Sequence, residues 1–270
     1  MHMESSPIFT AVEPVRPAAP YLGGKRNLAK RLVALIETIP HTVYAEPFVG
    51  MGGVFFRRRL RPKVEVINDW SRDVWTFFRM LQDHHNAFMD LIRFHISSRA
   101  EFDRLKSLDP ANLTDLQRAA RFLYLQRLAF GGKITGRNYG VSLDRPARFD
   151  VSRLAGDLAD IHDRLAGVEI ECQPWAEFVA RRDTPGTLFY LDPPYWACED
   201  DYGEGMFSRA DFEALAAVLK GLKGRFVMSL NDVPGVRETF KDFHIEGVGT
   251  HYGVAGGGAS PAREVIITPA

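Results

Sequence analysis

The chain has 270 residues, a formal net charge of zero, and 46% hydrophobic and 25% charged residues. These values fit one large α/β domain, or a core domain that carries one insertion, and they exclude a disordered or low-complexity chain. No apolar run approaches the roughly 18–20 residues that a membrane-spanning helix needs, so we expect no membrane partner.

The first 17 residues are rich in proline, alanine, serine and glutamate and contain no apolar segment of the kind found in secretory signals. We expect a flexible lead here. The two cysteines, Cys172 and Cys198, have no spacing typical of a disulfide framework or a metal site. A reduced, cytoplasmic protein that holds no metal is therefore predicted, and both thiols are interpreted as bystanders.

The N-terminal third reads as alternating helices and strands. Apolar residues recur with helical spacing from Leu28 to Ile39, and Pro40 ends this pattern. Short apolar runs at residues 42–45 and 64–67 predict strands, and residues 73–81 predict a helix. This order is typical of the start of a doubly wound α/β sheet with helices on both faces.

The pattern changes between residues 88 and 165, where helical periodicity and basic residues dominate. We interpret residues 88–165 as a mainly helical domain inserted into one core, which is formed by residues 18–87 and 166–270. The basic residues of this segment could form a solvated helix face, but the more specific interpretation is that they form a surface that contacts phosphates. Between Gln117 and Arg153, two acidic residues stand against eight basic ones, Arg118, Arg121, Arg127, Lys133, Arg137, Arg145, Arg148 and Arg153.

Strand patterns return in the C-terminal part, at residues 168–172, 187–191, 225–229 and 264–268. A helix is predicted over residues 211–222, with Ser208 as its N-cap and Asp211 in the capping-box position.

The strongest chemical signal is the segment Leu188–Trp196, in which an apolar strand runs directly into Asp192-Pro193-Pro194-Tyr195. Ligands bind at the carboxyl ends of the strands in an open α/β sheet, so this segment is expected to form a site. The prolines remove two amide donors, which leaves the Asp192 and Pro193 carbonyls as acceptors. The alternative interpretation is a purely structural turn at the end of a strand.

An acceptor pair beside an aromatic ring suits methylation of an aromatic amine, because the lone pair of such an amine is delocalised and weakly nucleophilic. The Asp192 carboxylate and a main-chain carbonyl can bind both amino hydrogens. Tyr195 can stack on the base, which must first leave the duplex. Alignment of the amine with the methyl donor matters more here than a strong base.

Three further segments are each weak evidence alone. A glycine-rich turn over Tyr44–Val54 follows a strand and precedes an expected helix, and its glycines allow close approach of a ligand. Asp69 ends the next strand and is placed to bind a ribose, although a helix N-cap is an equally good reading. Tyr21–Lys25 precedes the first helix and also fits a plain turn.

In this order the segments Y-L-G-G-K, E-P-F-V-G-M-G-G-V, I-N-D and D-P-P-Y resemble the Dam-type, α-group family of adenine DNA N6-methyltransferases, in the form of phage or prophage members. The resemblance spans about residues 18–267. It implies a Rossmann-like methyltransferase sheet, S-adenosylmethionine as methyl donor, double-stranded DNA as substrate, and no obligatory protein partner.

The resemblance also implies roles by position. Ser229-Leu230-Asn231-Asp232 resembles a family segment beside the pocket, and Arg263-Glu264-Val265 its closing element. The catalytic positions are Asp192, Pro193 and Tyr195. Those expected at the methyl donor are Tyr21, Lys25, Glu46, Phe48, Gly50, Asp69 and Asp192. Those expected at DNA are Arg127, Phe130, Lys133, Arg137 and Asn138.

One departure from the family pattern concerns the DNA sequence that is recognised. Where the cellular enzyme has an aromatic residue followed by asparagine, this chain has Phe130 and Gly131, so a G-A-T-C target does not follow. Phe130 can still act as a wedge between bases. Two alternatives stay open at this point: an enzyme of the same chemistry that acts on RNA adenine or a glutamine amide, and a nucleic-acid-binding protein without catalysis.

Overall fold

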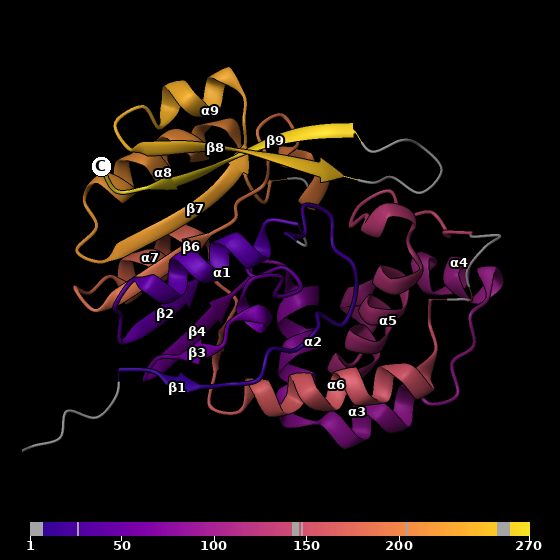
Figure 1. The fold of residues 1–270 in the computed structure, drawn as a ribbon. Helices are drawn as coiled ribbons and strands as arrows, with labels where there is room; N and C mark the ends of the chain where they lie inside the picture. Colours follow the sequence, from indigo (N-terminus) through magenta and orange to yellow (C-terminus); the bar gives the residue numbers. More distant parts are fainter. Residues whose placement is uncertain (1–7, 26, 142–145, 147, 204, 253–259) are drawn as a thin grey trace, which may run out of the picture.

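The computed structural model describes residues 8–25, 27–141, 146, 148–203, 205–252 and 260–270. Its centre is a seven-stranded sheet with the strand order β5-β4-β2-β6-β7-β9-β8, drawn in Figure 1. The first five strands in this order run parallel, whereas β9 is antiparallel to both β7 and β8. The chain reverses its direction of winding at β2, which lies between β4 and β6, and ligands bind at such a point in α/β sheets.

The elements are bounded as follows. The strands are β1 Thr10–Ala11, β2 Val43–Glu46, β3 Leu60–Arg61, β4 Val64–Asn68, β5 Glu169–Glu171, β6 Thr187–Leu191, β7 Arg225–Asn231, β8 His244–Tyr252 and β9 Ser260–Thr268. The helices are α1 Ala29–Thr38, α2 Arg72–Asp83, α3 His85–Ile92, α4 Arg99–Ser107, α5 Asp115–Leu128, α6 Val151–Leu165, α7 Trp175–Arg182, α8 Arg209–Lys220 and α9 Pro234–Thr239.

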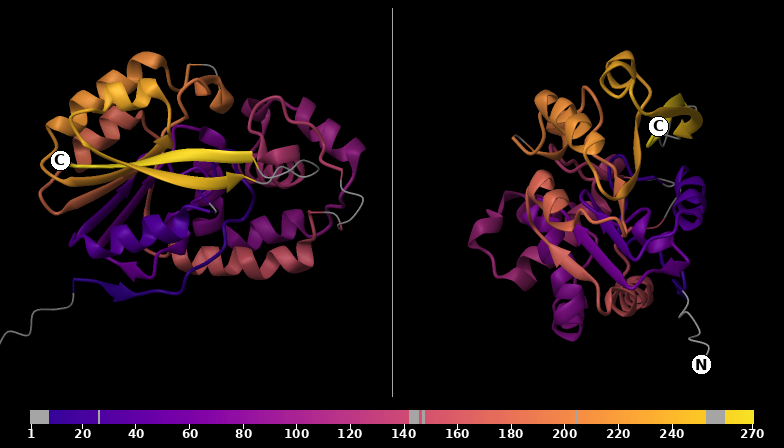
Figure 2. Two further views of the ribbon diagram at one scale, coloured as in Figure 1. Left: turned by 45° about the horizontal axis from the view of Figure 1, so that its top comes forward. Right: turned by 90° about the vertical axis from the view of Figure 1, so that its left-hand side faces the viewer.

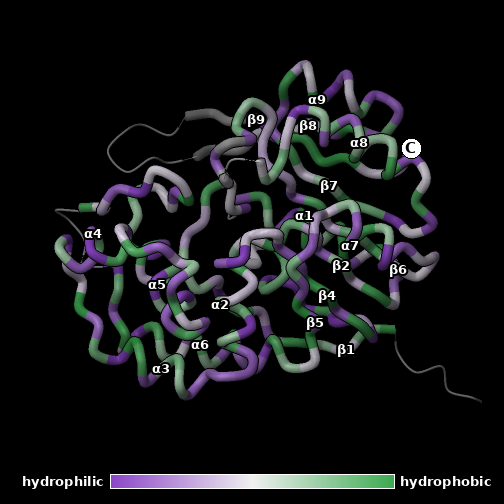
Figure 3. Tube along the Cα trace, turned by 180° about the vertical axis from the view of Figure 1, so that it is seen from behind, coloured by the Kyte–Doolittle hydropathy of each residue, from purple (hydrophilic) through white to green (hydrophobic). Residues whose placement is uncertain are grey.

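Both faces of the sheet are buried because successive side chains of a strand point to opposite sides. In β6, Leu188 and Tyr190 face one hydrophobic cluster, and Phe189 and Leu191 face the other. Helices α7, α8 and α9 cover the second face, while α1 and α2 cover the first. The helices are amphipathic, so apolar and polar stretches alternate along α3 and α6 in Figure 3.

Helices α3 to α6 come between β4 and β5 in the chain and lie together beside the sheet, as the left-hand view of Figure 2 shows. They are not separate from the core, because α5 and α6 pack on α2 and share its hydrophobic cluster. A buried ion-pair cluster adds to this attachment: Arg164, at the end of α6, binds Glu65 of β4 through two hydrogen bonds of 2.6 and 2.7 Å. Arg58 binds the same carboxylate from the other side.

The α/β architecture predicted from the sequence is confirmed. The strands expected at 42–45, 64–67, 187–191 and 225–229 agree with β2, β4, β6 and β7 to within two residues at each end. The capping box at the start of α8 is also confirmed, since the Asp211 carboxylate accepts hydrogen bonds from the Ser208 N–H and hydroxyl, at 2.8 and 2.6 Å.

Three expectations about elements are wrong or incomplete. The glycine-rich turn is followed only by a 3-10 helix, Phe55–Arg57, because Phe55 and Phe56 are pulled into the core. Helix α7 and strand β8 were not predicted. Of the lead expected over residues 1–17, residues 1–7 lie outside the described residues. In its second half, Thr10 pairs with Arg61 and Ala11 with Leu60.

Among the described residues, no helix is both long and apolar enough to cross a membrane.

Candidate active site

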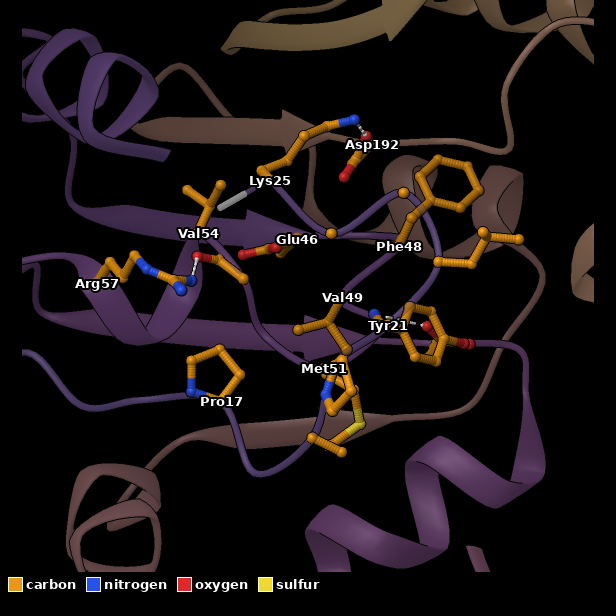
Figure 4. A pocket seen from close by; sticks show the side chains of 18 of the residues that line it. Pro17, Tyr21, Lys25, Glu46, Phe48, Val49, Met51, Val54, Arg57 and Asp192 are labelled. Atoms are coloured by element: carbon orange, nitrogen blue, oxygen red, sulfur yellow. Dashed lines mark hydrogen bonds and ion pairs between the residues drawn. The ribbon is translucent and has the colours of Figure 1, made fainter. Parts of the chain in front are cut away.

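A cavity of about 950 Å³ opens at the carboxyl ends of β2 and β6. The lining residues that Figure 4 labels come from three regions distant in sequence: the segment before α1, the end of β2 with the turn after it, and the end of β6. All seven residues expected at the methyl donor line it, namely Tyr21, Lys25, Glu46, Phe48, Gly50, Asp69 and Asp192. The structure thus brings together the positions that the sequence singled out for the methyl donor.

Asp192 stands at the end of β6, with its side chain 20% exposed toward the cavity. Its Oδ1 lies 2.8 Å from Lys25 Nζ and accepts a hydrogen bond of 3.3 Å from the Ser229 hydroxyl. Burial raises the pKa of Asp192 to about 6, and the nearby Lys25 ammonium opposes this rise. The carboxylate is therefore held in one orientation and ionised at neutral pH.

Lys25 is the centre of a buried polar cluster, because it is only 2% exposed and touches three partners. Besides Asp192, its Nζ donates to the Tyr195 hydroxyl at 2.5 Å and lies 4.2 Å from the centre of that ring. Glu264 of β9 completes the cluster, with Oε2 at 3.5 Å from Nζ. Lys25 therefore fixes the acid and the aromatic ring of the D-P-P-Y segment relative to each other.

The turn after β2 forms the floor of the cavity. Gly50 has φ of +51°, and a Cβ placed there would lie 2.9 Å from the ring of Tyr21. This position requires glycine for two reasons, the left-handed backbone and the ring that lies directly against it. Tyr21 and Gly50, from two separate segments, thus form one wall.

Asp69 ties this turn to the start of α2. Its Oδ2 accepts the Gly50 N–H and its Oδ1 accepts the Ser71 N–H, both at 2.9 Å. The N-cap of α2 is Ser71, so Asp69 is not the cap itself. Burial raises the pKa of Asp69 to about 6 although both hydrogen bonds lower it. A carboxylate has about four acceptor positions, so two remain for a ligand in the cavity.

Glu46 ends β2 beneath the same cavity and is 1% exposed. It accepts a hydrogen bond of 2.9 Å from the Tyr44 hydroxyl. Burial raises its pKa to about 8, and the charge of Asp192 adds to this effect. Glu46 is therefore largely protonated at neutral pH and can donate a hydrogen bond into the cavity.

The residues expected at DNA fall into two groups. Phe130, Lys133 and Asn138 are exposed at the end of α5 and in the loop after it, and the Phe130 side chain is 44% exposed. Arg137 is instead buried, because its guanidinium donates to Gln126 Oε1 at 3.0 Å and to the Lys133 carbonyl at 3.2 Å. The Arg137 side chain is therefore not presented on the surface beside Phe130, Lys133 and Asn138.

Arg127 also has internal partners, at 2.6 Å from the Ala18 carbonyl and 2.8 Å from that of Arg148, although it lines the cavity as well. Of the other basic residues, Arg118 pairs with Asp73 at 2.5 Å, and Arg121 is buried and donates to the Leu105 carbonyl. Arg145 lies outside the described residues. Much of the local positive charge is thus used in contacts within the insertion and between the insertion and the core.

Sequence reasoning missed two residues of this region, Glu264 and Gln126. Glu264 lies in a closing element that was noted for its resemblance alone, and only the pairing of β9 with β7 places it near Lys25. Gln126 is 0% exposed, and its position directly after the apolar run Phe122–Leu125 of α5 is the signal that marks it.

Comparison with known proteins agrees with this geometry. A family model described as "D12 class N6 adenine-specific DNA methyltransferase" matches residues 21–254. Type II methyltransferase M1.LlaDCHI of Lactococcus lactis subsp. cremoris is 28% identical over 279 residues, which cover 94% of this chain and 95% of that protein. Type II methyltransferase M.CviBI of Paramecium bursaria Chlorella virus NC1A is 22% identical, with 85% and 88% covered.

A third relative, the DNA N-6-adenine-methyltransferase of Escherichia phage P1, is 25% identical over 86% of this chain and 33% of its own length. The match to the family model spans all four segments on which the resemblance rested, from Tyr21 to the D-P-P-Y segment. The chain belongs to the D12 class of N6 adenine-specific DNA methyltransferases.

Proposed function

We propose that the Asp192–Tyr195 segment binds the amine of an extruded adenine, and that the cavity between Tyr21 and Asp69 binds S-adenosylmethionine. The observation that carries this proposal is the contact of Lys25 with both Asp192 and Tyr195, where Lys25 and Asp192 line a cavity large enough for a cofactor of this size. The reaction is inferred from the family, and the role of each residue is inferred from its position in the site.

Asp192 would accept one hydrogen of the adenine amine, and the Pro193 carbonyl would accept the other. These two bonds favour a pyramidal nitrogen whose lone pair points toward the methyl donor. The Lys25 ammonium keeps Asp192 ionised and therefore able to accept. Tyr195, held by the same ammonium, would stack on the base.

S-Adenosylmethionine, when bound, supplies an electrophilic methyl group. The residues present fit it, because Asp69 retains acceptor capacity for the two ribose hydroxyls after binding Gly50 and Ser71. Phe48 and Tyr21 provide apolar surface on either side of the glycine turn. Glu46 would lie beneath the donor as a hydrogen-bond donor, as its raised pKa allows.

The ionisation state of the Asp192 carboxyl group makes the rate of methyl transfer depend on pH. The acceptor role needs the carboxylate, and its pKa of about 6 lies above the ordinary value. With S-adenosylmethionine saturating, we therefore expect kcat/KM for DNA to fall about tenfold per pH unit below pH 6, because protonation removes the acceptor. Initial rates between pH 5 and 8, on enzyme shown to be folded by circular dichroism, measure this. A flat profile down to pH 5 would contradict the role.

The Gly50–Tyr21 contact makes cofactor affinity sensitive to one methyl group. Gly50→Ala introduces a Cβ at 2.9 Å from the Tyr21 ring, so the ring must move into the cavity. We expect the Kd for S-adenosylhomocysteine, measured by calorimetry, to rise at least about tenfold. Gly167→Ala is the matched control, because Gly167 also has a positive φ, +72°, but meets only the end of the Arg61 side chain. Equal affinity in both variants would refute the assignment.

The inserted segment 88–165 would recognise the target in double-stranded DNA, with Phe130, Lys133 and Asn138 presented on its surface and Arg127 and Arg137 less exposed beside them. The experiment that tests the function as a whole is modification-aware sequencing of plasmid DNA from cells that express the chain, which reports the modified base and its sequence context together. We expect N6-methyladenine in one short sequence. Methyl transfer to RNA or protein in a parallel assay, with unmodified DNA, would favour the alternative substrates.

No step in this scheme uses a metal ion. We therefore expect the initial rate of methyl transfer to stay unchanged when EDTA is added in excess, since the carboxylate, the carbonyl and the ring provide all contacts to the amine. The control is the same reaction with EDTA already saturated by Mg²⁺. A loss of activity that added divalent metal restores would overturn the metal-free scheme.

A further inference from the structure

Gln126, near the end of α5, joins a segment that lines the cavity, residues 18–25, to the loop 129–140. Its Nε2 donates to the Pro20 carbonyl at 2.9 Å and to the Gly132 carbonyl at 2.7 Å. Its Oε1 accepts from Arg137 at 3.0 Å. The side chain is 0% exposed, so each of these bonds is made in the protein interior, where the loss of one partner is costly.

One of the joined segments is residues 18–25, which carries Tyr21 and Lys25. Two more contacts with the insertion hold it: Leu22 N–H donates to the Gly132 carbonyl at 3.1 Å, and Arg127 donates to the Ala18 carbonyl at 2.6 Å. Tyr21, in the middle of this segment, lies against Gly50 in the wall of the cavity. The position of the Tyr21 ring therefore depends on the insertion.

The other joined segment is the loop 129–140, whose neck is closed by the Phe130 N–H bond to the Asn138 carbonyl, at 2.9 Å. Gly132 in this loop has φ of +69°, and a Cβ there would lie 3.2 Å from backbone atoms of Pro20 and Tyr21. The backbones of the two segments are thus in direct contact. The outer side of the same loop presents Lys133 and Asn138 to solvent.

We propose that Gln126 couples the two substrate sites: it positions segment 18–25 and the loop 129–140 as one unit, so that DNA bound to the loop strengthens cofactor binding. This inference rests on the proposed function. Fixing the loop on DNA also fixes the Pro20 and Gly132 carbonyls, and hence Tyr21. Cofactor binding then has less ordering left to accomplish, and the coupling is reciprocal by linkage.

The test uses Gln126→Glu, which keeps an acceptor for Arg137 but turns a carboxylate toward the two carbonyls. The matched control is Gln82→Glu, because Gln82 Nε2 also binds two carbonyls, of Leu165 and Val168 at 2.7 and 2.8 Å, and lies outside the walls of the cavity. Gln126→Met and Gln82→Met form a second pair that adds no buried charge, in case the first pair fails to fold.

The measured quantity is the Kd for S-adenosylhomocysteine, with and without a short duplex that carries the mapped methylation site. An abasic nucleotide replaces the target adenosine, so that no contact between base and cofactor contributes. We expect the duplex to lower this Kd about tenfold in the unmodified protein and in both Gln82 variants, but less than about twofold in both Gln126 variants. Hydrogen exchange of the Leu22 backbone amide should slow on DNA binding in the unmodified protein and in the Gln82 variants, but not in the Gln126 variants.

Two results would overturn the coupling: a duplex that leaves the Kd unchanged in the unmodified protein, or Gln126 variants that retain the full effect. Failure of the proposed function is a different result, since it would appear as an absence of methylated DNA from the unmodified protein. A Gln126 variant that loses affinity equally with and without DNA would indicate a merely structural role and would also contradict the coupling.

Discussion

Asp192→Ala is expected to lower kcat for DNA adenine methylation at least about 100-fold and to leave the fold intact. Removal of one preorganised hydrogen-bond partner of a transition state costs about this much in other enzymes. Because the bond strengthens as the amine becomes pyramidal, kcat and kcat/KM should fall together. The fold should persist, since Lys25 keeps Glu264 as a charged neighbour at 3.5 Å. Steady-state rates and thermal unfolding measure the two parts.

Asp242→Ala is a suitable control, because Asp242 pairs with Lys220 on the surface, with both side chains more than half exposed. It should have ordinary activity and stability. Near-normal turnover by the Asp192 variant would remove the carboxylate from the mechanism. A lower melting temperature that accounts for the lost activity would instead make Asp192 a structural residue.

Glu65→Ala is expected to have the largest effect on stability, about 3–5 kcal/mol, because it leaves buried guanidinium groups without their shared carboxylate. The Arg58 and Glu65 side chains are both 0% exposed, and Arg164 is 3% exposed. Such a loss is a large part of the roughly 5–15 kcal/mol by which proteins of this kind are stable. Urea unfolding followed by circular dichroism measures it.

Glu177→Ala provides the comparison, since Glu177 and Arg181 form an exposed pair at 4.0 Å whose contribution is about 0–1 kcal/mol. A change of less than about 1 kcal/mol for Glu65→Ala would mean that water or other groups compensate the two arginines. The lowered pKa of Glu65, caused by its arginine neighbours despite burial, agrees with an ionised carboxylate in this cluster.

The sequence predicted the central sheet and its acidic residues well because both depend on local patterns. A buried strand that ends in an acid, as at Asp69 and Asp192, marks the carboxyl edge of an α/β sheet wherever the rest of the chain lies. The order of the four segments then selected the methyltransferase family. Prediction of these residues needed no knowledge of long-range contacts.

The errors arise where long-range contacts decide the outcome. Arg137 and Arg127 look like free basic residues in the sequence, but Gln126 and the carbonyls of distant loops bind them. Strand β8 was missed because its glycines at 247 and 249 weaken the apolar pattern, whereas its pairing along the whole of β9 stabilises it. Glu264 could be assigned to the site only from the position of β9 between β7 and β8.

The position of β9 has a consequence for how the protein folds. This strand, late in the chain, must enter between two strands that precede it, and it brings Glu264 to Lys25, which lies before the first helix. Contacts between such distant residues require large loops to close, so they form late in a folding reaction. We therefore expect the polar cluster at the centre of the site to be among the last parts of the molecule to form, so that the site is complete only when the sheet is complete.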